Sequence, residues 1–284
     1  MFWRLFTSGI DRYRHGEESW ALVTGGSDGI GKGLCEVLAS KGFNVFIHGR
    51  NQTKLVSVLE ELKVTYPTRQ FEVIVADATN PALASEVAAA VAQKNLTILI
   101  NNAGYTDTAI RAFVLTDHQE FDKAIAIGVG WITHLTRELL PLLMKNEPSL
   151  MVNVGSYVQS HPPPFLAVYS ATKGYTLALT QSLRTEMQYT SHPNVEIQYH
   201  EIHSVSTHSN RKAPGLTRPT AHRMAEAIVG AVGSGRGFVV PYWPHELVSW
   251  VLWILPEGVV NSLAAGVLQD RRVDVEGKGK GKDD

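Results

Sequence analysis

The feature that most constrains the fold is a glycine-rich turn between an apolar run and a helical pattern near the start of the chain. The run Trp20–Thr24 leads into Gly25-Gly26-Ser27-Asp28-Gly29-Ile30-Gly31, and residues 32–39 have helical spacing of apolar side chains. A buried strand, a glycine turn and a helix start, in that order, predict a parallel α/β unit that binds the phosphates of a dinucleotide. Gly25 allows the tight turn, Gly29 lets the backbone approach a pyrophosphate, and Gly31 lets the helix pack on the strand.

Apolar runs and helical stretches alternate along the whole chain, which predicts a doubly wound parallel α/β sheet with helices on both faces. The expected strands are Ala21–Thr24, Val45–His48, Phe71–Ala76, Leu96–Asn101, Leu150–Gly155, Val195–Ile202 and Gly237–Val240. The expected helices lie near Ile30–Lys41, Thr53–Tyr66, Pro81–Gln93, Asp117–Lys145, Ala167–Thr190 and Ala221–Gly233. Ligands of such sheets bind beyond the carboxyl ends of the strands, where Gly25–Gly31, Asn101–Gly104 and Gly155–Ser156 are expected.

Three polar residues in the second half of the chain indicate acid–base chemistry. Tyr169 and Lys173 are four residues apart, so on a helix the phenol and the amine lie on one face. A phenol titrates near ~10 in water, and a neighbouring ammonium is expected to lower the pKa of Tyr169 toward neutral pH. Ser156 would hold a carbonyl oxygen while Tyr169 transfers the proton. A surface tyrosine and lysine on an amphipathic helix is the alternative interpretation.

Together with Asn101-Asn102-Ala103-Gly104, these motifs resemble the single-domain branch of the short-chain dehydrogenase/reductase family, from about Trp20 to about Pro241. The resemblance implies a seven-stranded Rossmann sheet in the order 3-2-1-4-5-6-7 and a nicotinamide cofactor. It also implies that Ser156, Tyr169 and Lys173 are catalytic, with Lys173 holding the nicotinamide ribose. The cofactor-binding residues that it implies are Gly25, Ser27, Asp28, Gly29, Ile30, Gly31, Arg50, Asp77, Asn102, Ala103, Gly104, Tyr169, Lys173 and Thr207.

The end of the second expected strand bears on the choice between NADH and NADPH. NAD-dependent members of the family carry an aspartate where this chain has Gly49, and the following Arg50 is suited to a 2′-phosphate. The prediction is NADP(H). Asp28 argues against it, because NADP-dependent members often have a basic residue there, and a solvated Arg50 is the alternative. The positions that the resemblance assigns to the adenine, its ribose and the carboxamide are Asp77, Asn102 with Gly104, and Thr207.

Two departures from the family pattern bear on activity. Gly128 stands where the family has an asparagine that supports a proton relay to the lysine; glycine keeps the carbonyl and permits a local helix distortion, so we expect reduced activity or a rewired relay. The Pro-Gly pair that the family carries after the sixth strand is missing before Thr207, which leaves the path of that loop open. No metal is predicted, because no cysteine accompanies His200, His203 and His208.

Local features narrow the resemblance. Residues 20–25, 27–32 and 240–245 resemble the branch that holds very-long-chain 3-oxoacyl-CoA reductases and 17β-hydroxysteroid dehydrogenases, which implies an apolar fatty acyl or steroid-like ketone and membrane association. Leu247–Leu268 is apolar, but Pro256 divides it, and neither half reaches the ~20 residues needed to span a bilayer. We expect two short amphipathic helices that cover the substrate, lie on a membrane or contact another subunit, with ordinary packing as the alternative.

Composition limits the remaining possibilities. A hydrophobic content of 44% suffices for a large core, and a net charge of −1 without a basic stripe argues against nucleic acid as a partner. The single Cys35 cannot form an internal disulfide, which fits a reducing compartment. We therefore expect an intracellular protein at the endoplasmic reticulum or another membrane surface, with the cytoplasm as the alternative.

The expected organisation is an N-terminal extension (1–16), a catalytic domain (17–243), an apolar helical extension (244–272) and a disordered tail (273–284). The main functional interpretation is an NADPH-dependent reductase of an apolar ketone. Gly128 and the missing Pro-Gly pair motivate a second one, a weakly active cofactor-binding scaffold; a soluble reductase of a secondary metabolite is a third. The resemblance also allows a homodimer through the helices near Asp117–Lys145 and Ala167–Thr190.

Overall fold

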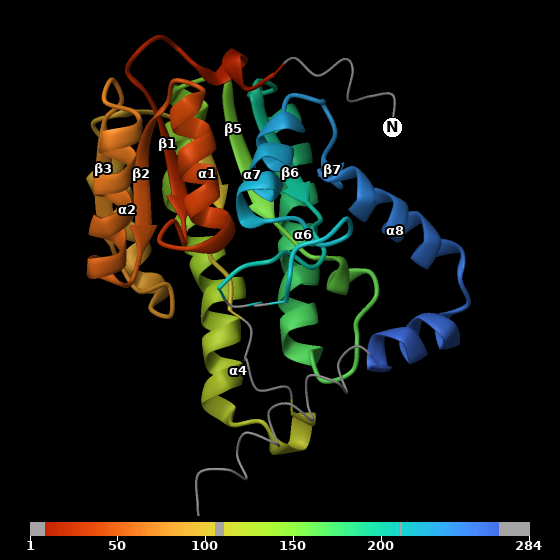
Figure 1. The fold of residues 1–284 in the computed structure, drawn as a ribbon. Coiled ribbons are helices and arrows are strands. Elements are labelled where there is room, and N and C mark those ends of the chain that lie inside the picture. The colour runs from red at the N-terminus through yellow and green to blue at the C-terminus, as the bar shows by residue number, and fades with distance from the viewer. Residues whose placement is uncertain (1–8, 106–110, 209, 211, 267–284) are drawn as a thin grey trace, which may run out of the picture.

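A single parallel sheet forms the centre of the computed structural model, which describes residues 9–105, 111–208, 210 and 212–266. Its strands lie in the order β3-β2-β1-β4-β5-β6-β7, and every neighbouring pair is parallel (Figure 1). They are β1 (Ser19–Thr24), β2 (Asn44–Gly49), β3 (Phe71–Val75), β4 (Asn95–Asn101), β5 (Ser149–Val154), β6 (Val195–His200) and β7 (Phe238–Val239). The predicted fold class, the seven strands and their order are confirmed.

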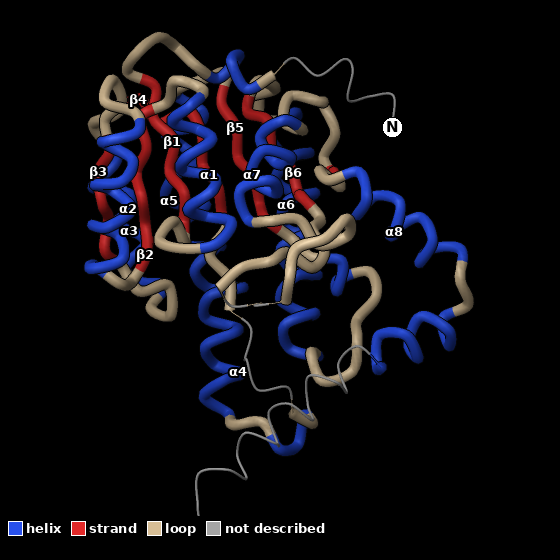
Figure 2. The backbone as a smooth tube through the Cα atoms, viewed as in Figure 1, coloured by secondary structure: helices blue, strands red, loops and turns tan. Residues whose placement is uncertain are grey.

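Helices cover both faces of the sheet (Figure 2). The α-helices are α1 (Gly29–Ser40), α2 (Gln52–Thr65), α3 (Ala84–Val91), α4 (His118–Ile125), α5 (Ile132–Lys145), α6 (Ala167–Tyr189), α7 (Ala221–Gly230) and α8 (Trp243–Ile254). One core joins α1, α2 and α7 to the sheet, and the other joins α3, α5 and α6 to it. In β1, Ala21 and Val23 enter the first core while Trp20 and Leu22 enter the second. This two-sided burial explains why the central strands are continuous apolar runs.

The single helix expected over Asp117–Lys145 is divided. A π-helical segment, η5 (Ala126–Trp131), separates α4 from α5. Two glycines in this segment lie against neighbouring side chains: a β-carbon on Gly130 would stand 2.7 Å from Pro81 Cγ, and one on Gly128 would collide with Thr172 of α6. The local distortion that Gly128 was expected to permit is therefore present, and it brings η5 against the helix that carries Tyr169 and Lys173.

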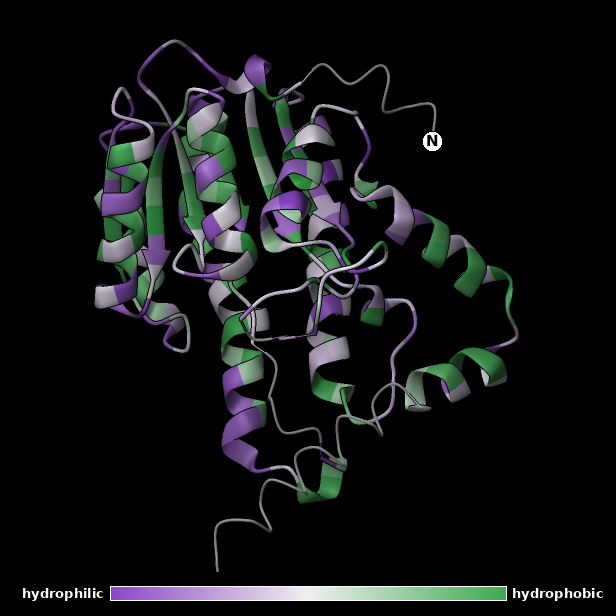
Figure 3. Ribbon diagram, viewed as in Figure 1, coloured by the Kyte–Doolittle hydropathy of each residue, from purple (hydrophilic) through white to green (hydrophobic). Residues whose placement is uncertain are grey.

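The C-terminal part forms two short helices, as predicted. Helix α8 ends before Pro256, and a second helix covers 257–266 (Figure 1). Large apolar side chains of both remain exposed, among them Trp250 (67%) and Trp253 (72%). The ribbons of both helices contain hydrophobic stretches (Figure 3). Among the described helices, none combines the length and the apolar character that crossing a bilayer requires.

The N-terminal part of the described chain packs against β6. A 3-10 turn, η2 (Ile10–Tyr13), buries Tyr13, whose hydroxyl donates to the carboxylate of Glu196 at 2.6 Å. The four-part organisation of the chain stays a prediction. The disordered tail predicted for 273–284 lies outside the described residues, as do 1–8.

Candidate active site

The glycine-rich turn lies at the carboxyl end of β1 and leads into α1. The backbone of Gly25 and Gly29 has positive φ values of 68° and 54°, which suit glycine best. A β-carbon on Gly31 would overlap the carbonyl oxygen of Gly25, so the helix starts this close to the strand only with glycine there. The carboxylate of Asp28 accepts from the N–H of Gly29 at 2.6 Å and caps the helix.

A cavity of about 460 Å³ opens along this edge of the sheet. Its lining includes twelve of the fourteen predicted cofactor-binding residues: Gly25, Ser27, Asp28, Gly29, Ile30, Gly31, Arg50, Asp77, Asn102, Ala103, Gly104 and Thr207. The other two, Tyr169 and Lys173, lie just beyond, since a β-carbon on Gly104 would stand 3.7 Å from Lys173 Nζ. The structure thus brings the predicted residues together around one elongated cavity of the size that holds a cofactor.

The end of the cavity beside β2 is basic. Arg50 and Lys54 both line it, and Lys54 Nζ lies 3.5 Å from a carboxylate oxygen of Asp28. The lysine compensates the acidic side chain that argued against NADP(H). Sequence reasoning missed Lys54, although its place one helical turn after Arg50 at the start of α2 was a usable signal.

The turn after β4, which lines the cavity, is hydrogen-bonded to the end of β1 at the centre of the sheet. The side-chain amide of Asn102 donates to the carbonyl of Thr24 at 2.9 Å, and the Thr24 hydroxyl accepts from the N–H of Ala103 at 2.9 Å. These contacts hold β1 and β4 together where both strands end. The predicted stabilising role of Asn102 has a direct structural basis here.

The three predicted catalytic residues meet at the ends of β5 and α6. Lys173 is buried, and its ammonium donates to the carbonyl of Val154 at 2.9 Å. Burial lowers the pKa of Lys173 to about 8. Burial raises the pKa of Tyr169 to about 12, although a hydrogen bond from Ser156 opposes the rise. The lysine amine lies 5.8 Å from the centre of the Tyr169 ring.

The expected lowering of the Tyr169 pKa by Lys173 is therefore wrong for this arrangement. The amine is directed at the Val154 carbonyl, and desolvation of the phenol outweighs the favourable partners. Tyr169 is consequently a protonated phenol at neutral pH, which is the form that gives a proton away. Ser156 and Tyr169 still share a hydrogen bond, which brings the two hydroxyls of the predicted site together.

Comparison with known proteins decides the family. A model described as short chain dehydrogenase matches residues 19–214. The chain belongs to the short-chain dehydrogenase family. Its relatives include a very-long-chain 3-oxoacyl-CoA reductase of Podospora anserina, 28% identical over 95% of this chain and 80% of the relative, and one of Ajellomyces capsulatus, 30% identical over 82% and 71%. The predicted resemblance to that group is confirmed.

Solved structures agree on the fold of this short-chain dehydrogenase. A structure from a study of 7β-hydroxysteroid dehydrogenase stereoselectivity aligns with a TM-score of 0.76 at 20% identity, covering 89% of this chain and 99% of the other. A short-chain dehydrogenase of Sphingobium yanoikuyae in complex with NADPH aligns with a TM-score of 0.70 at 21% identity, covering 84% and 96%.

A second, smaller cavity of this short-chain dehydrogenase is lined in part by Tyr169. It has a volume of about 80 Å³ and is mostly apolar, lined among others by Phe113, Phe121, Phe165 and Leu166. Phe165 has a φ of 67°, in the left-handed region that a bulky side chain avoids. Such strain is typical of functional sites, and here it falls in the loop that leads into the catalytic helix.

The loop after β6 reaches the cofactor cavity without the family's Pro-Gly pair. Thr207 lines the cavity as predicted, and its backbone exchanges two hydrogen bonds with Asn210, at 3.1 and 3.2 Å. This turn fixes the path that the sequence left open. The nearby His200 and His203 contact the side chains of Gln198 and Ser249 respectively.

Proposed function

We propose that this short-chain dehydrogenase reduces the ketone of a fatty acyl-type substrate, with NADPH as the hydride donor. The observation that carries the proposal is that Tyr169 lines the apolar cavity, while Lys173, one helical turn away on α6, adjoins the cavity lined by the predicted cofactor residues. The relatives named very-long-chain 3-oxoacyl-CoA reductases support this substrate class.

The residues at two places in the larger cavity, the glycine turn and the corner beside β2, support its fit to NADPH. At the turn before α1, Gly31 lets the start of the helix lie against Gly25, and the first N–H groups of α1 are available there to a pyrophosphate. Beside β2, the guanidinium of Arg50 and the ammonium of Lys54 offer charged donors to a 2′-phosphate. The glycine at position 49 adds no carboxylate to this corner, and the carboxylate of Asp28 is paired with Lys54.

The reaction needs a hydride at the ketone carbon and a proton at its oxygen. NADPH supplies the hydride when bound. The phenol of Tyr169, whose pKa of about 12 keeps it protonated, gives its proton to the developing alkoxide, while Ser156 donates a hydrogen bond to the same oxygen. Lys173 holds a positive charge below about pH 8, and its ammonium would hold the nicotinamide ribose hydroxyls of the bound cofactor.

The test is a set of NADPH oxidation assays with 3-oxoacyl-CoAs of increasing chain length, a keto-steroid and a simple aryl ketone. We expect turnover with the acyl substrates and almost none in Tyr169→Phe, with NADPH affinity preserved. Turnover that survives in Tyr169→Phe would contradict the mechanism. Binding of NADPH without turnover on any ketone would favour the scaffold, and activity on small ketones alone would favour the soluble reductase.

We further propose that α8 and the helix over 257–266 rest on an intracellular membrane surface, such as the endoplasmic reticulum. Trp250, Trp253, Ile254 and Leu263 are exposed in spite of their size, and aromatic residues favour the interface of a bilayer. Flotation with phosphatidylcholine vesicles should recover the chain and should fail for Trp250→Glu/Trp253→Glu. A homodimer through the helices of 117–145 and 167–190 stays a prediction, which light scattering would check.

A further inference from the structure

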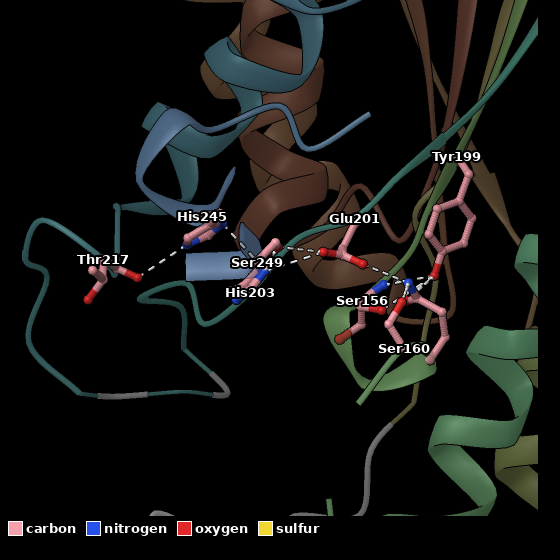
Figure 4. Close-up of polar contacts among 9 residues, drawn as sticks. Ser156, Ser160, Tyr199, Glu201, His203, Thr217, His245 and Ser249 are labelled. Atoms are coloured by element: carbon pink, nitrogen blue, oxygen red, sulfur yellow. Dashed lines mark hydrogen bonds and ion pairs between the residues drawn. The ribbon is translucent and has the colours of Figure 1, made fainter. Parts of the chain in front are cut away.

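A buried carboxylate lies behind the candidate active site. Glu201 follows β6, is 3% exposed, and has no direct contact with the two cavities. Its backbone N–H donates to Val239 of β7 at 2.8 Å, which fixes it to the edge of the sheet. Burying a charge costs free energy unless hydrogen bonds compensate it, so the partners of this side chain indicate why it is there (Figure 4).

One arm of hydrogen bonds runs from Glu201 to the catalytic serine. The side-chain N–H of Gln159 donates to Glu201 Oε2 at 2.7 Å, and the hydroxyl of Tyr199 donates to the side-chain oxygen Oε1 of Gln159 at 2.8 Å. The backbone N–H of Ser156 then donates to the Tyr199 hydroxyl at 3.1 Å. The Tyr199 ring also occupies the space beside Gly155, where a β-carbon would overlap it. Backbone hydrogen bonds hold the residues on either side, from Gly155 to His200 at 2.8 Å and from Tyr157 to Ile202 at 3.1 Å. The Tyr199 hydroxyl, held by Gln159, is the partner of the Ser156 N–H itself.

The other arm runs from Glu201 to α8. The hydroxyl of Ser249 donates to Glu201 Oε1 at 2.8 Å and accepts from His203 Nε2 at 2.8 Å. The backbone N–H of His203 donates to Nδ1 of His245, 3.2 Å away, near the start of α8 (Figure 4). A separate ring contact joins the same regions, since His161 of the loop before α6 meets Trp253 edge to face at 6.0 Å.

Both arms need an acceptor at their meeting point. A carboxylate accepts from Gln159 and from Ser249 at once, whereas an amide would have to donate to one of them. Burial by itself raises the pKa of Glu201, but hydrogen bonds from His203, Ser249 and Gln159 hold it below its ordinary value. The carboxylate is thus ionised at neutral pH, and the direction of every hydrogen bond in both arms follows from it.

We propose that Glu201 is a positioning residue for the reduction: through Gln159 and Tyr199 it holds Ser156 in place, and through Ser249 it makes the docking of α8 a condition for that geometry. The inference rests on the proposed role of Ser156. If Glu201 has this role, α8 belongs to the network that orients the substrate oxygen, whatever surface the outer face of α8 contacts.

The test compares variants of this network with matched variants of a second network on the same strand. Glu196 of β6 is also buried, at 8% exposure, and accepts from a tyrosine hydroxyl, that of Tyr13, at 2.6 Å. The side chains that donate to it, those of Tyr13, Arg12 and Gln198, line neither of the two cavities. Glu201→Gln and Tyr199→Phe are therefore measured against Glu196→Gln and Tyr13→Phe, for kcat, KM, NADPH affinity and melting temperature.

We expect Glu201→Gln and Tyr199→Phe to lower kcat about tenfold, the effect of misplacing one strong hydrogen bond, with NADPH affinity unchanged. The controls should keep kcat even where they melt earlier. Ser249→Ala should lower kcat in the same way, and Ser249→Thr, which keeps a hydroxyl, should have normal kcat. The fall in kcat of Ser249→Ala/Glu201→Gln should be smaller than the product of the two single falls, because the two groups act as one unit.

Equal kcat in Glu201→Gln and Glu196→Gln would overturn the proposal. So would a fall in kcat that is proportional to the fall in melting temperature for the variants of both networks. Ser156→Ala serves as the reference for the underlying mechanism. If that variant keeps full activity, the role of Ser156 is wrong. If it loses activity while Glu201→Gln keeps it, the mechanism stands and the positioning role of Glu201 fails.

Discussion

A β-carbon placed on Gly128 would stand 2.6 Å from the β-carbon of Thr172. The two residues belong to η5 and α6, and the absence of a side chain at 128 sets how closely these segments approach. The hydroxyl of Thr172 donates to the carbonyl of Tyr169 at 2.8 Å, so this contact lies one turn from the catalytic tyrosine. Gly128 is therefore a packing requirement of this chain, in addition to being a departure from the family pattern.

Substitution of Gly128 should destabilise the protein. We expect Gly128→Ala to lower the free energy of unfolding by about 1–3 kcal/mol, the usual cost of overpacking, and Gly128→Asn to lower it further. Urea unfolding measures both. Thr172→Gly removes the opposing side chain, so Gly128→Ala/Thr172→Gly should be more stable than the sum of the single changes predicts. Simple additivity would show that the contact is not the cause.

The same contact changes how the missing asparagine is tested. Gly128→Asn alone introduces the relay side chain and a collision together, so a fall in activity would not separate them. In a Thr172→Gly background the collision is relieved. A higher kcat of Gly128→Asn/Thr172→Gly than of Thr172→Gly would identify the relay as a missing component, and equal values would mean that the chain compensates for it.

The preference for NADPH over NADH should depend on Arg50 and Lys54, the basic residues at the end of the cavity beside β2. We expect Arg50→Ala to weaken NADPH binding by about tenfold or more, because a charged hydrogen bond to phosphate is worth about 1.5–3 kcal/mol, with little effect on NADH. Lys54→Ala should have a smaller effect of the same kind. Lys63→Ala is the matched control, since Lys63 lies on α2 with the same exposure as Lys54 but pairs with Glu60, whereas Lys54 pairs with Asp28. Fluorescence titration with both cofactors measures this.

A complementary change should favour NADH. A β-carbon on Gly49 would meet its nearest neighbours, Leu55 and Ser27, at 3.4 and 3.5 Å, so a side chain fits there. Gly49→Asp adds a carboxylate that repels a 2′-phosphate and accepts from a 2′-hydroxyl. The ratio of NADPH to NADH affinity should fall at least tenfold. An unchanged ratio in a folded variant would show that the phosphate lies elsewhere.

Lys173 should reduce the stability of the protein at neutral pH. Its pKa falls from 10.5 to about 8 on folding, so between these values the unfolded chain binds more protons, and the contribution of this group to stability rises with pH. Below about pH 8 the cost is about 3 kcal/mol. Lys173→Met removes this cost but also a hydrogen bond to Val154 worth about 1 kcal/mol, leaving a gain of about 2 kcal/mol. Urea unfolding at neutral and alkaline pH would show that the gain shrinks as pH rises.

The pH dependence of reduction should reflect the titration of Lys173 and not that of Tyr169. With a pKa of about 12, Tyr169 remains protonated across the accessible range, whereas Lys173 loses its charge above about pH 8. We expect kcat/KM to decline above about pH 8. Lys173→Arg, which keeps its charge, should have lower activity without this decline. A decline that persists in the arginine variant would assign it to another group.

Local patterns in the sequence predict much of the fold and of the cofactor cavity. Two-sided burial makes the strands apolar throughout, and the glycine turn specifies its own strand and helix, so β1 and α1 follow from a short segment. The network around Glu201 could not be predicted in the same way. Gln159, Glu201 and Ser249 are far apart in sequence, and none has a spacing that indicates a partner. The pKa of Tyr169 depends on desolvation by the whole fold, which the spacing of Tyr169 and Lys173 does not contain.

The overlap between Tyr199 and the space beside Gly155 has a consequence for sequence comparison. Only one of the two positions can be large, because a side chain at 155 would enter the volume of the tyrosine ring. Relatives with a small residue at 199 are free of this restriction. The identities at these two positions should therefore covary among homologues, and a homologue that is large at both must have a different backbone before its serine.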